Sequence, residues 1–404
     1  MLDERLIDVL VERLVNRIEE GNAYILGKIG ESIKQIGALT PTKAMQLQQI
    51  LKYGGNYDKI VEKLAEITQL NVAEIYKIFE EVAKNDYLFA KQFYDYKGVK
   101  YIPYEENIAL QNQVKALARI TANQYVNLSN TLAFTKKVNG RIVYTDLART
   151  YQDAIDTAVL NVAQGKGTFD EQMFYTLKEL GASGIKTVDY ANGRSMRLDT
   201  AVRMNLKGAL RNLHNETQAV FGKEFGADGV EISVHENPAP DHAEVQGRQF
   251  SKQEFDKFQN DQYAVDYTGK VFPPEHEGHD RRSISEYNCY HYTFDIVLGV
   301  SKPNYSTEEL QQILDNNEKG FELDGTHYTN YEGTQLQRQL ETAIRKQKDI
   351  QIIAKTSGNK ELVADSQSKI TMLAKKYKEL SVVSGLPTKA DRLRVSGYKR
   401  ISIK

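Results

Sequence analysis

Apolar residues at helical spacing dominate the first 130 residues of the chain. Near the N-terminus a leucine or isoleucine recurs at every fourth position, which places these side chains on one face of an α-helix. These residues are Leu2, Leu6, Leu10, Leu14 and Ile18. Farther along, Asn71 is followed three positions later by Glu74, the pattern of a capping box, which predicts a helix start. We therefore predict an all-helical module over residues 1–130, typical of an interaction or packing domain.

The middle of the chain, residues 131–331, mixes strand and helix patterns. Strand-like segments flank Asn139-Gly140 and again Asn192-Gly193, and Asn-Gly is the pair preferred in two-residue hairpin turns. Helices are expected over residues 146–165 and 200–221, strands over residues 229–234 and 294–297, and a further helix start at Ser306, which Glu309 follows in a capping box. This region is predicted to form a small mixed core with β-hairpins.

Two further apolar seams lie in residues 332–384, on either side of Ser357-Gly358-Asn359. Their spacing of three and four residues favours two antiparallel helices packed at coiled-coil-like angles. Gly385-Leu386-Pro387 is expected to end the second helix, and the final residues, with Lys399, Arg400 and Lys404, to form a flexible basic end. The predicted fold class is α+β, predominantly α-helical, with residues 332–404 as a basic helical hairpin and tail.

Charge is distributed unevenly along the chain. The whole chain has a net charge of −1, but residues 338–404 hold 16 lysines and arginines against 6 acids. That segment therefore carries about +10 and the remainder about −11. A basic segment of this kind can bind nucleic acid or an acidic protein. The alternative is a solvated helical surface, because acids are interspersed among the bases.

Composition excludes two broad classes of protein. Cys289 is the only cysteine, so no intramolecular disulfide can form. The first residues carry acids where a secretory signal carries bases, and no apolar run approaches the roughly 20 residues of a membrane helix. We expect a soluble protein made in a cytoplasm, without a membrane span.

Residues 235–310 concentrate the residue types that carry chemistry. They contain Cys289 and five of the seven histidines, namely His235, His242, His276, His279 and His291. Imidazoles and a thiolate can form a tetrahedral zinc site. However, the spacing of His276 and His279 is not that of a zinc-binding helix. The alternative is a buried Cys289 and a hydrogen-bonded His291. The sequence favours this structural interpretation, with no bound metal or cofactor.

Catalytic motifs are incomplete or absent. A nucleophilic Cys289 would need a positioned base and an oxyanion hole, and its surroundings match no known nucleophile motif. No glycine-rich phosphate loop occurs, since Gly165-Lys166-Gly167-Thr168 is explained as a loop before a helix. These observations exclude a nucleotide-driven motor.

Three blocks of sequence carry a resemblance to a known family. The first is Asp241 to Arg248, DHAEVQGR; the second is Asn288 to Ser306, with NCYH and GVSKPNYS; the third is Tyr331 to Arg338, YEGTQLQR. In these blocks the chain resembles the phage minor capsid protein 2 family, related to Mu-type head-morphogenesis proteins. The likeness covers roughly residues 130–394. The chain departs from the family at Val245, where the family has Trp, at Tyr290, where it has Arg, and at Ser285, where it often has a second Cys.

The resemblance implies a structural minor capsid protein of a tailed phage or prophage. Such a protein acts at or near the portal vertex in head assembly or genome delivery, is carried in the virion and is assembled in the host bacterial cytoplasm. The implied partners are phage portal and capsid proteins, with an oligomer around the portal and non-specific contact with packaged DNA as further expectations. The competing hypothesis is a metal-dependent hydrolase or toxin-like enzyme that uses the cluster at residues 235–291.

The candidate site residues fall into two groups. Those expected to hold the family motif together are His242, Glu244, Gln246, Gly247, Cys289, His291, Gly299, Pro303 and Tyr305. Those expected to contact DNA or a partner are Arg281, Arg282, Lys375, Lys376, Lys378, Arg392 and Arg394. No catalytic residue is assigned.

Overall fold

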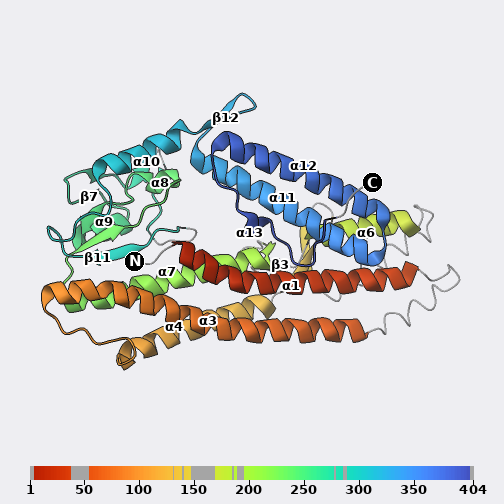
Figure 1. Cartoon of the computed structure of the whole chain (residues 1–404), viewed down its shortest axis with the longest axis horizontal. Coiled ribbons are helices and arrows are strands. Elements are labelled where there is room, and N and C mark those ends of the chain that lie inside the picture. The colour runs from red at the N-terminus through yellow and green to blue at the C-terminus, as the bar shows by residue number, and fades with distance from the viewer. Residues whose placement is uncertain are drawn as a thin grey trace.

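Long helices form the body of the protein (Figure 1). The computed structural model describes residues 4–37, 54–130, 132–138, 141–146, 169–183, 186–188, 195–276, 279–284 and 289–400. Four helices pack together as a bundle: α1 (Glu4–Gly37), α3 (Gly54–Lys97), α4 (Ile108–Asn130) and α7 (Leu198–Phe225). Each has an apolar stripe that faces the others, as helical spacing requires.

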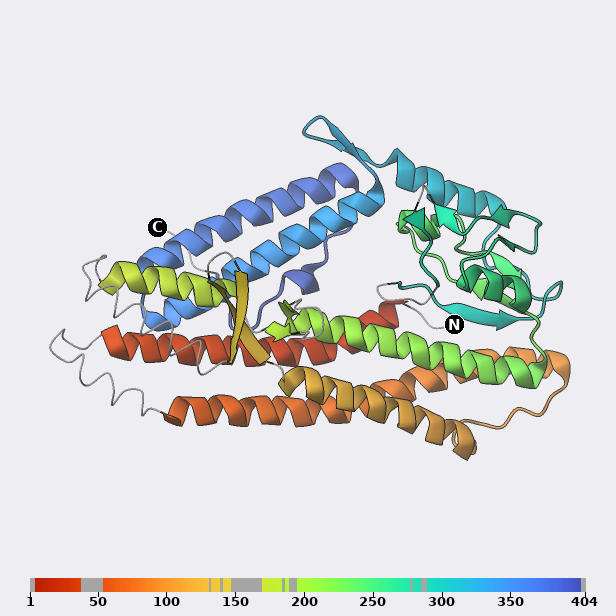
Figure 2. The same cartoon turned by 180° about the vertical axis from the view of Figure 1, so that it is seen from behind.

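The C-terminal helical hairpin lies along α1 (Figures 1 and 2). It consists of α11 (Asn330–Ser357) and α12 (Lys360–Ser384), which pack against each other along their length. Gly358 adopts φ +80° and Asn359 caps α12, so the predicted turn is confirmed. The hairpin also leans on the body, because α11 packs on α1 and on α6 (Phe169–Ser183).

Both predicted Asn-Gly hairpins form strands in one sheet. The first pairs β1 (Leu132–Val138) with β2 (Arg141–Asp146), and the second pairs β3 (Lys186–Val188) with β4 (Ser195–Arg197). The strand order is β2-β1-β3-β4. The helix expected over residues 146–165 lies outside the described residues.

A small α+β unit, residues 229–328, lies at one end of the body (Figure 2). Its main sheet has the order β11-β5-β6, and smaller hairpins and short helices surround it. The elements are β5 (Gly229–Ile232), α8 (Pro240–Ala243), β6 (Gln249–Ser251), α9 (Lys252–Gln259), β7 (Ala264–Val265), β8 (Val271–Phe272), β9 (Glu275–His276), β10 (His279–Asp280), β11 (Thr293–Ile296), α10 (Thr307–Lys319), β12 (Phe321–Leu323) and β13 (Thr326–Tyr328). The predicted capping box at Ser306 and Glu309 is present.

The protein has two hydrophobic cores. The larger runs from Ile7 to Val395 and combines the N-terminal helices with α7, the C-terminal hairpin and the β11 segment of the small unit. The smaller contains seven buried residues between Ile232 and Ile284. The predicted α+β fold, predominantly α-helical, is confirmed. The division at residues 130 and 331 stays a prediction about folding units, since the N-terminal helices share the larger core. Among the described helices, none is both long and apolar enough to cross a membrane.

One local prediction is wrong. Asn71 does not start a helix but lies inside α3, fully buried, where its side chain donates to the Tyr125 hydroxyl and accepts from Arg17. Burial and these hydrogen bonds override the local capping pattern.

The segment after α12 returns to the body. Val395 is buried in the larger core and the Lys348 ammonium donates to the Leu393 carbonyl. Lys399 and Arg400 are exposed and Lys404 lies outside the described residues, so the flexible basic end stays a prediction.

Candidate functional site

His242, Cys289 and His291 meet inside the small unit. His242 belongs to the short helix α8, and the other two lie in the extended segment that leads into β11. The Cys289 sulfur is 3.6 Å from His242 Nδ1 and 3.5 Å from His291 Nδ1. The three residues are 1%, 2% and 3% exposed in the order His242, Cys289, His291. Residues 47 positions apart in the sequence thus form one enclosed cluster, which we call the His-Cys cluster.

Hydrogen bonds fix the orientation of both imidazoles. His242 Nε2 lies 2.7 Å from the Arg282 carbonyl oxygen, which can only accept, so Nε2 carries the proton. His291 Nε2 lies 3.3 Å from Gln246 Oε1. The His235 backbone N–H donates to the same Gln246 atom at 2.8 Å, which identifies this atom as the amide oxygen and not the amide nitrogen. In their neutral forms both rings therefore turn an Nδ1 lone pair toward Cys289.

Burial keeps His291 neutral. Its removal from solvent, together with the neighbouring His235, His242 and Arg282, lowers the pKa of His291 to about 2. Burial also opposes protonation of His242, but the hydrogen bond with Cys289 and the Arg282 carbonyl outweigh it and raise the pKa of His242. The two imidazoles that face Cys289 therefore differ, since a proton is disfavoured on His291 and favoured on His242.

Gln246 and Gly247 hold the loop that carries the cluster. The Gln246 amide accepts from the His235 N–H and donates to the His235 carbonyl, which joins residues 11 positions apart. Gly247 adopts φ +70° and donates its N–H to the Ile232 carbonyl. A Cβ there would meet Leu310 and would lie 2.8 Å from Val234. Glycine is favoured here by both conformation and space.

We expect Gly247→Ala to lower the free energy of unfolding by about 2–3 kcal/mol, because the left-handed backbone and the crowding both oppose a Cβ. Urea unfolding measures the change. Gly98→Ala is the matched control, since Gly98 has φ +64° with nothing within 4 Å of the added Cβ. Equal losses in the two variants would show that crowding at Gly247 has no effect.

Other motif residues lie around the cluster rather than in it. Glu244 is partly exposed and accepts from Arg281 at 3.3 Å. Val245, at the position where the family has Trp, is fully buried in the smaller core. Gly299 adopts φ +73° in the turn after β11, while Pro303 and Tyr305 are exposed in the loop that follows.

The two arginines of the small unit are engaged inside it. Arg281 is buried and donates to the Asp241 carbonyl at 2.9 Å. Arg282 donates to both Asp241 carboxylate oxygens, at 2.6 and 2.9 Å. Arg281 is therefore not presented to a DNA phosphate, and only part of the Arg282 side chain reaches solvent.

The basic residues of the C-terminal hairpin lie differently. Lys375, Lys376 and Lys378 are exposed on α12. Arg392 is half-buried, 3.9 Å from Glu341, whereas Arg394 is exposed. The lysines of α12 are thus the most accessible of the predicted contact residues.

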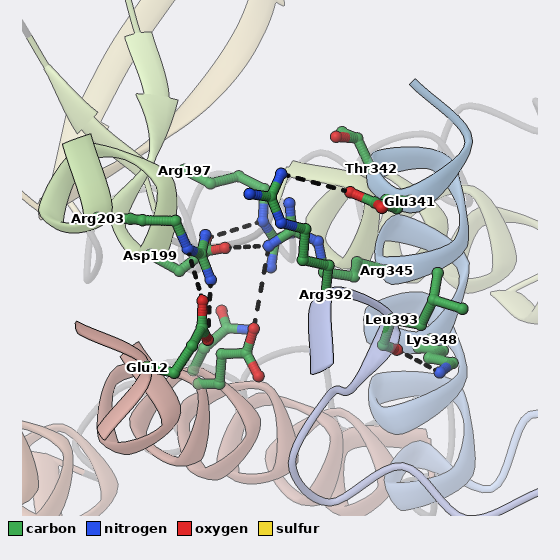
Figure 3. Close-up of polar contacts among 12 residues, drawn as sticks. Glu12, Arg197, Asp199, Arg203, Glu341, Thr342, Arg345, Lys348, Arg392 and Leu393 are labelled. Atoms are coloured by element: carbon green, nitrogen blue, oxygen red, sulfur yellow. Dashed lines mark hydrogen bonds and ion pairs between the residues drawn. The ribbon is translucent and has the colours of Figure 1, made fainter. Parts of the chain in front are cut away.

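A buried ionic cluster that the sequence patterns did not predict lies between α1, the start of α7 and α11 (Figure 3). Its members are Glu12, Glu19, Arg197, Asp199, Arg203, Arg345 and Asp349. Arg197 donates to Asp349 at 2.6 Å and to Asp199 at 3.1 Å, and Arg345 also donates to Asp199. In the sequence, Arg345 and Asp349 each stand next to an apolar residue of the helical seam. Charged residues on a solvated helix face show the same pattern, so it could not identify a buried cluster.

Glu19 is the surplus carboxyl of this cluster. Three arginines face four acids, and Glu19 is 3.9 Å from Arg345. Burial, followed by repulsion from Asp199, raises the pKa of Glu19 to about 8. Glu19 is therefore mostly protonated at neutral pH.

Comparison with known families decides the class of the protein. A family model described as phage minor capsid protein 2 matches residues 2–380. The chain belongs to this family. The match includes the N-terminal helices, where the individual motifs had given no resemblance. No curated protein matches the chain, and no solved structure does. Family membership makes the protein a structural protein of a bacteriophage and a component of the virion.

Proposed function

We propose that this phage minor capsid protein acts at or near the portal vertex, in head assembly or genome delivery. It is assembled in the host bacterial cytoplasm and binds portal or capsid protein, with several copies arranged around the portal. Family membership supports the class of partner. The contact surface that we propose is the outward side of α12, because of the side chains exposed there.

This surface, the outer face of α12, combines bases with exposed apolar side chains. Its members are Met372, Lys375, Lys376, Lys378, Val382 and Val383. Val382 is 73% exposed, while Tyr377 and Leu380 of the same helix are buried against α11. An exposed apolar strip beside positive charge is typical of a contact surface for an acidic protein.

Charge reversal on this face tests the proposal. We expect the triple substitution Lys375→Glu, Lys376→Glu, Lys378→Glu to weaken co-sedimentation with purified portal or proheads about tenfold or more at low salt. Wild-type binding should itself weaken between 0.1 and 1 M salt, because the Debye length falls from about 10 Å to about 3 Å.

The matched control reverses three exposed lysines on other helices, Lys77, Lys223 and Lys319. Its overall charge change is identical, so any effect of net charge alone appears in both proteins. If the two triple variants bind portal equally well, the outer face of α12 is not the contact surface.

The same lysines are the strongest candidates for contact with packaged DNA. Phosphate binding requires only clustered bases, and it produces a steep loss of affinity with salt. An electrophoretic mobility-shift titration with DNA, using the two triple variants, distinguishes contact with DNA from contact with the portal. Loss of DNA binding with unchanged portal binding would favour contact with the genome.

We propose a structural role rather than the competing hydrolase or toxin-like activity. Cys289 and its two histidines are enclosed, which is favourable for a structural cluster and unfavourable for a nucleophile that must reach a substrate. Turnover of a peptide or ester substrate that disappears in Cys289→Ala would overturn this part of the proposal.

A further inference from the structure

We propose that His242, Cys289 and His291 bind one zinc ion, which acts as a structural cross-link of the small unit. The sequence alone favoured no metal, because the neighbouring His276 and His279 have the wrong spacing and the family's second cysteine position is Ser285. The arrangement of the three side chains in space reverses that expectation.

The two sulfur–nitrogen distances fit tetrahedral coordination, and zinc would draw the two nitrogens to about 3.3 Å from a separation within 4.8 Å. Zinc lies about 2.3 Å from a cysteine sulfur and about 2.0–2.1 Å from a histidine nitrogen, so sulfur and nitrogen bound to the same ion are about 3.5 Å apart. The sulfur–nitrogen distances in the His-Cys cluster are 3.5 and 3.6 Å. All three candidate ligand atoms lie within 4.8 Å of one another, and all three residues are buried.

The orientation of the lone pairs also favours a cation. Both imidazoles turn Nδ1 toward the same sulfur, since each Nε2 faces a hydrogen-bond acceptor. A thiol has one hydrogen and can donate to only one of these nitrogens. A divalent cation between the three atoms would satisfy both nitrogens and the thiolate together, with loss of the thiol proton to solvent on binding.

The outer hydrogen bonds are those of a metal site. Zinc-bound histidines usually donate their second N–H to a backbone carbonyl or a carboxylate or amide oxygen, which fixes the ring. His242 has the Arg282 carbonyl in this role, and His291 has Gln246 Oε1. The Cys289 carbonyl, in turn, accepts from Arg211 of α7, which ties the site to the body.

The site joins two segments of the small unit. The smaller core contains seven buried apolar residues, while Tyr292, Phe294, Ile296 and Val297 of the same unit pack in the larger core. The three ligands join the loop after β5 to the segment that leads into β11. A structural ion in an enclosed site would stabilise both, and the fourth position is left to water or to His235, whose ring centroid is 4.4 Å from that of His291.

The test uses the full-length protein stripped of metal with a chelator. On titration with Zn²⁺ we expect one equivalent to bind and the unfolding temperature to rise by roughly 5–10 °C. With Co²⁺ in place of zinc, a thiolate-to-cobalt charge-transfer band and intense visible bands are expected, typical of tetrahedral coordination with one sulfur. Since Cys289 is the only cysteine, that charge-transfer band reports on this site alone.

Variants then assign the ligands. Cys289→Ser should lose the charge-transfer band, and His242→Ala should weaken zinc binding at least tenfold. His327→Ala, a change at an exposed histidine outside the cluster, should alter neither. Because a cluster variant can fail to fold, the wild-type measurements stand alone as a test. The proposal is overturned if stripped wild-type protein binds no zinc and melts at the same temperature with and without it, or if cobalt binds without a sulfur band.

Discussion

Replacing Asp349 with alanine is expected to destabilise the folded protein by about 3–5 kcal/mol, because it removes one of the two carboxylates that face the buried Arg197 guanidinium. Asp349 is fully buried on α11. It accepts from Arg197 at 2.6 Å and from Asn22 of α1 at 3.0 Å. One carboxylate therefore joins the N-terminal helix, the β4–α7 junction and the C-terminal hairpin.

Urea or thermal unfolding of the purified variant measures this loss. The matched control is Asp365→Ala, since Asp365 pairs with Lys369 on the exposed surface of α12 at 2.7 Å. Exposed pairs of this type contribute about 0–1 kcal/mol. A loss at Asp349 no larger than that at Asp365 would mean that the buried ionic cluster does not join the parts of the fold.

The stability of the protein is expected to fall as pH rises from about 4.5 to about 8, through Glu19. The pKa of Glu19 is raised from 4.5 to about 8, so between these values the folded state holds a proton that the unfolded state has lost. The contribution of Glu19 to the free energy of unfolding is fully present below pH 4.5 and is lost as the pH approaches about 8. The full change is on the order of 3–5 kcal/mol.

Glu19→Gln removes this proton equilibrium while keeping the shape of the side chain. We expect its stability relative to wild type to increase steadily between pH 5 and pH 8, as measured by urea unfolding at each pH. Glu20→Gln changes the adjacent, exposed residue of α1 and should show no such trend. Parallel pH profiles for wild type and Glu19→Gln would contradict the assignment of Glu19.

Periodic patterns and turn residues were sufficient to predict the main elements. The strands on either side of both Asn-Gly pairs form hairpins, and Gly358 and Asn359 end one helix of the C-terminal pair and start the next. These signals are local, because the required backbone conformation depends on the residue itself. Asn71 shows the limit of such signals, since a hydrogen bond to Tyr125, 54 positions away, outweighs the capping pattern.

Long-range polar contacts could not be predicted in the same way. Arg197 and Asp349 are 152 positions apart, and nothing in either local sequence distinguishes a buried charge from a solvated one. The family motifs brought His242 and Cys289 to attention, but only the fold gives the distances between them. Val395 and Tyr398 likewise pack on elements distant in the sequence, which no local pattern indicates.

The most direct test of the account is cross-linking mass spectrometry on purified phage particles with a lysine-reactive reagent. We expect the protein to be present in mature particles in few copies, and Lys375, Lys376 and Lys378 of α12 to cross-link to the portal protein. Particles that lack the protein, or that contain it cross-linked only to the major capsid protein away from the portal vertex, would contradict it.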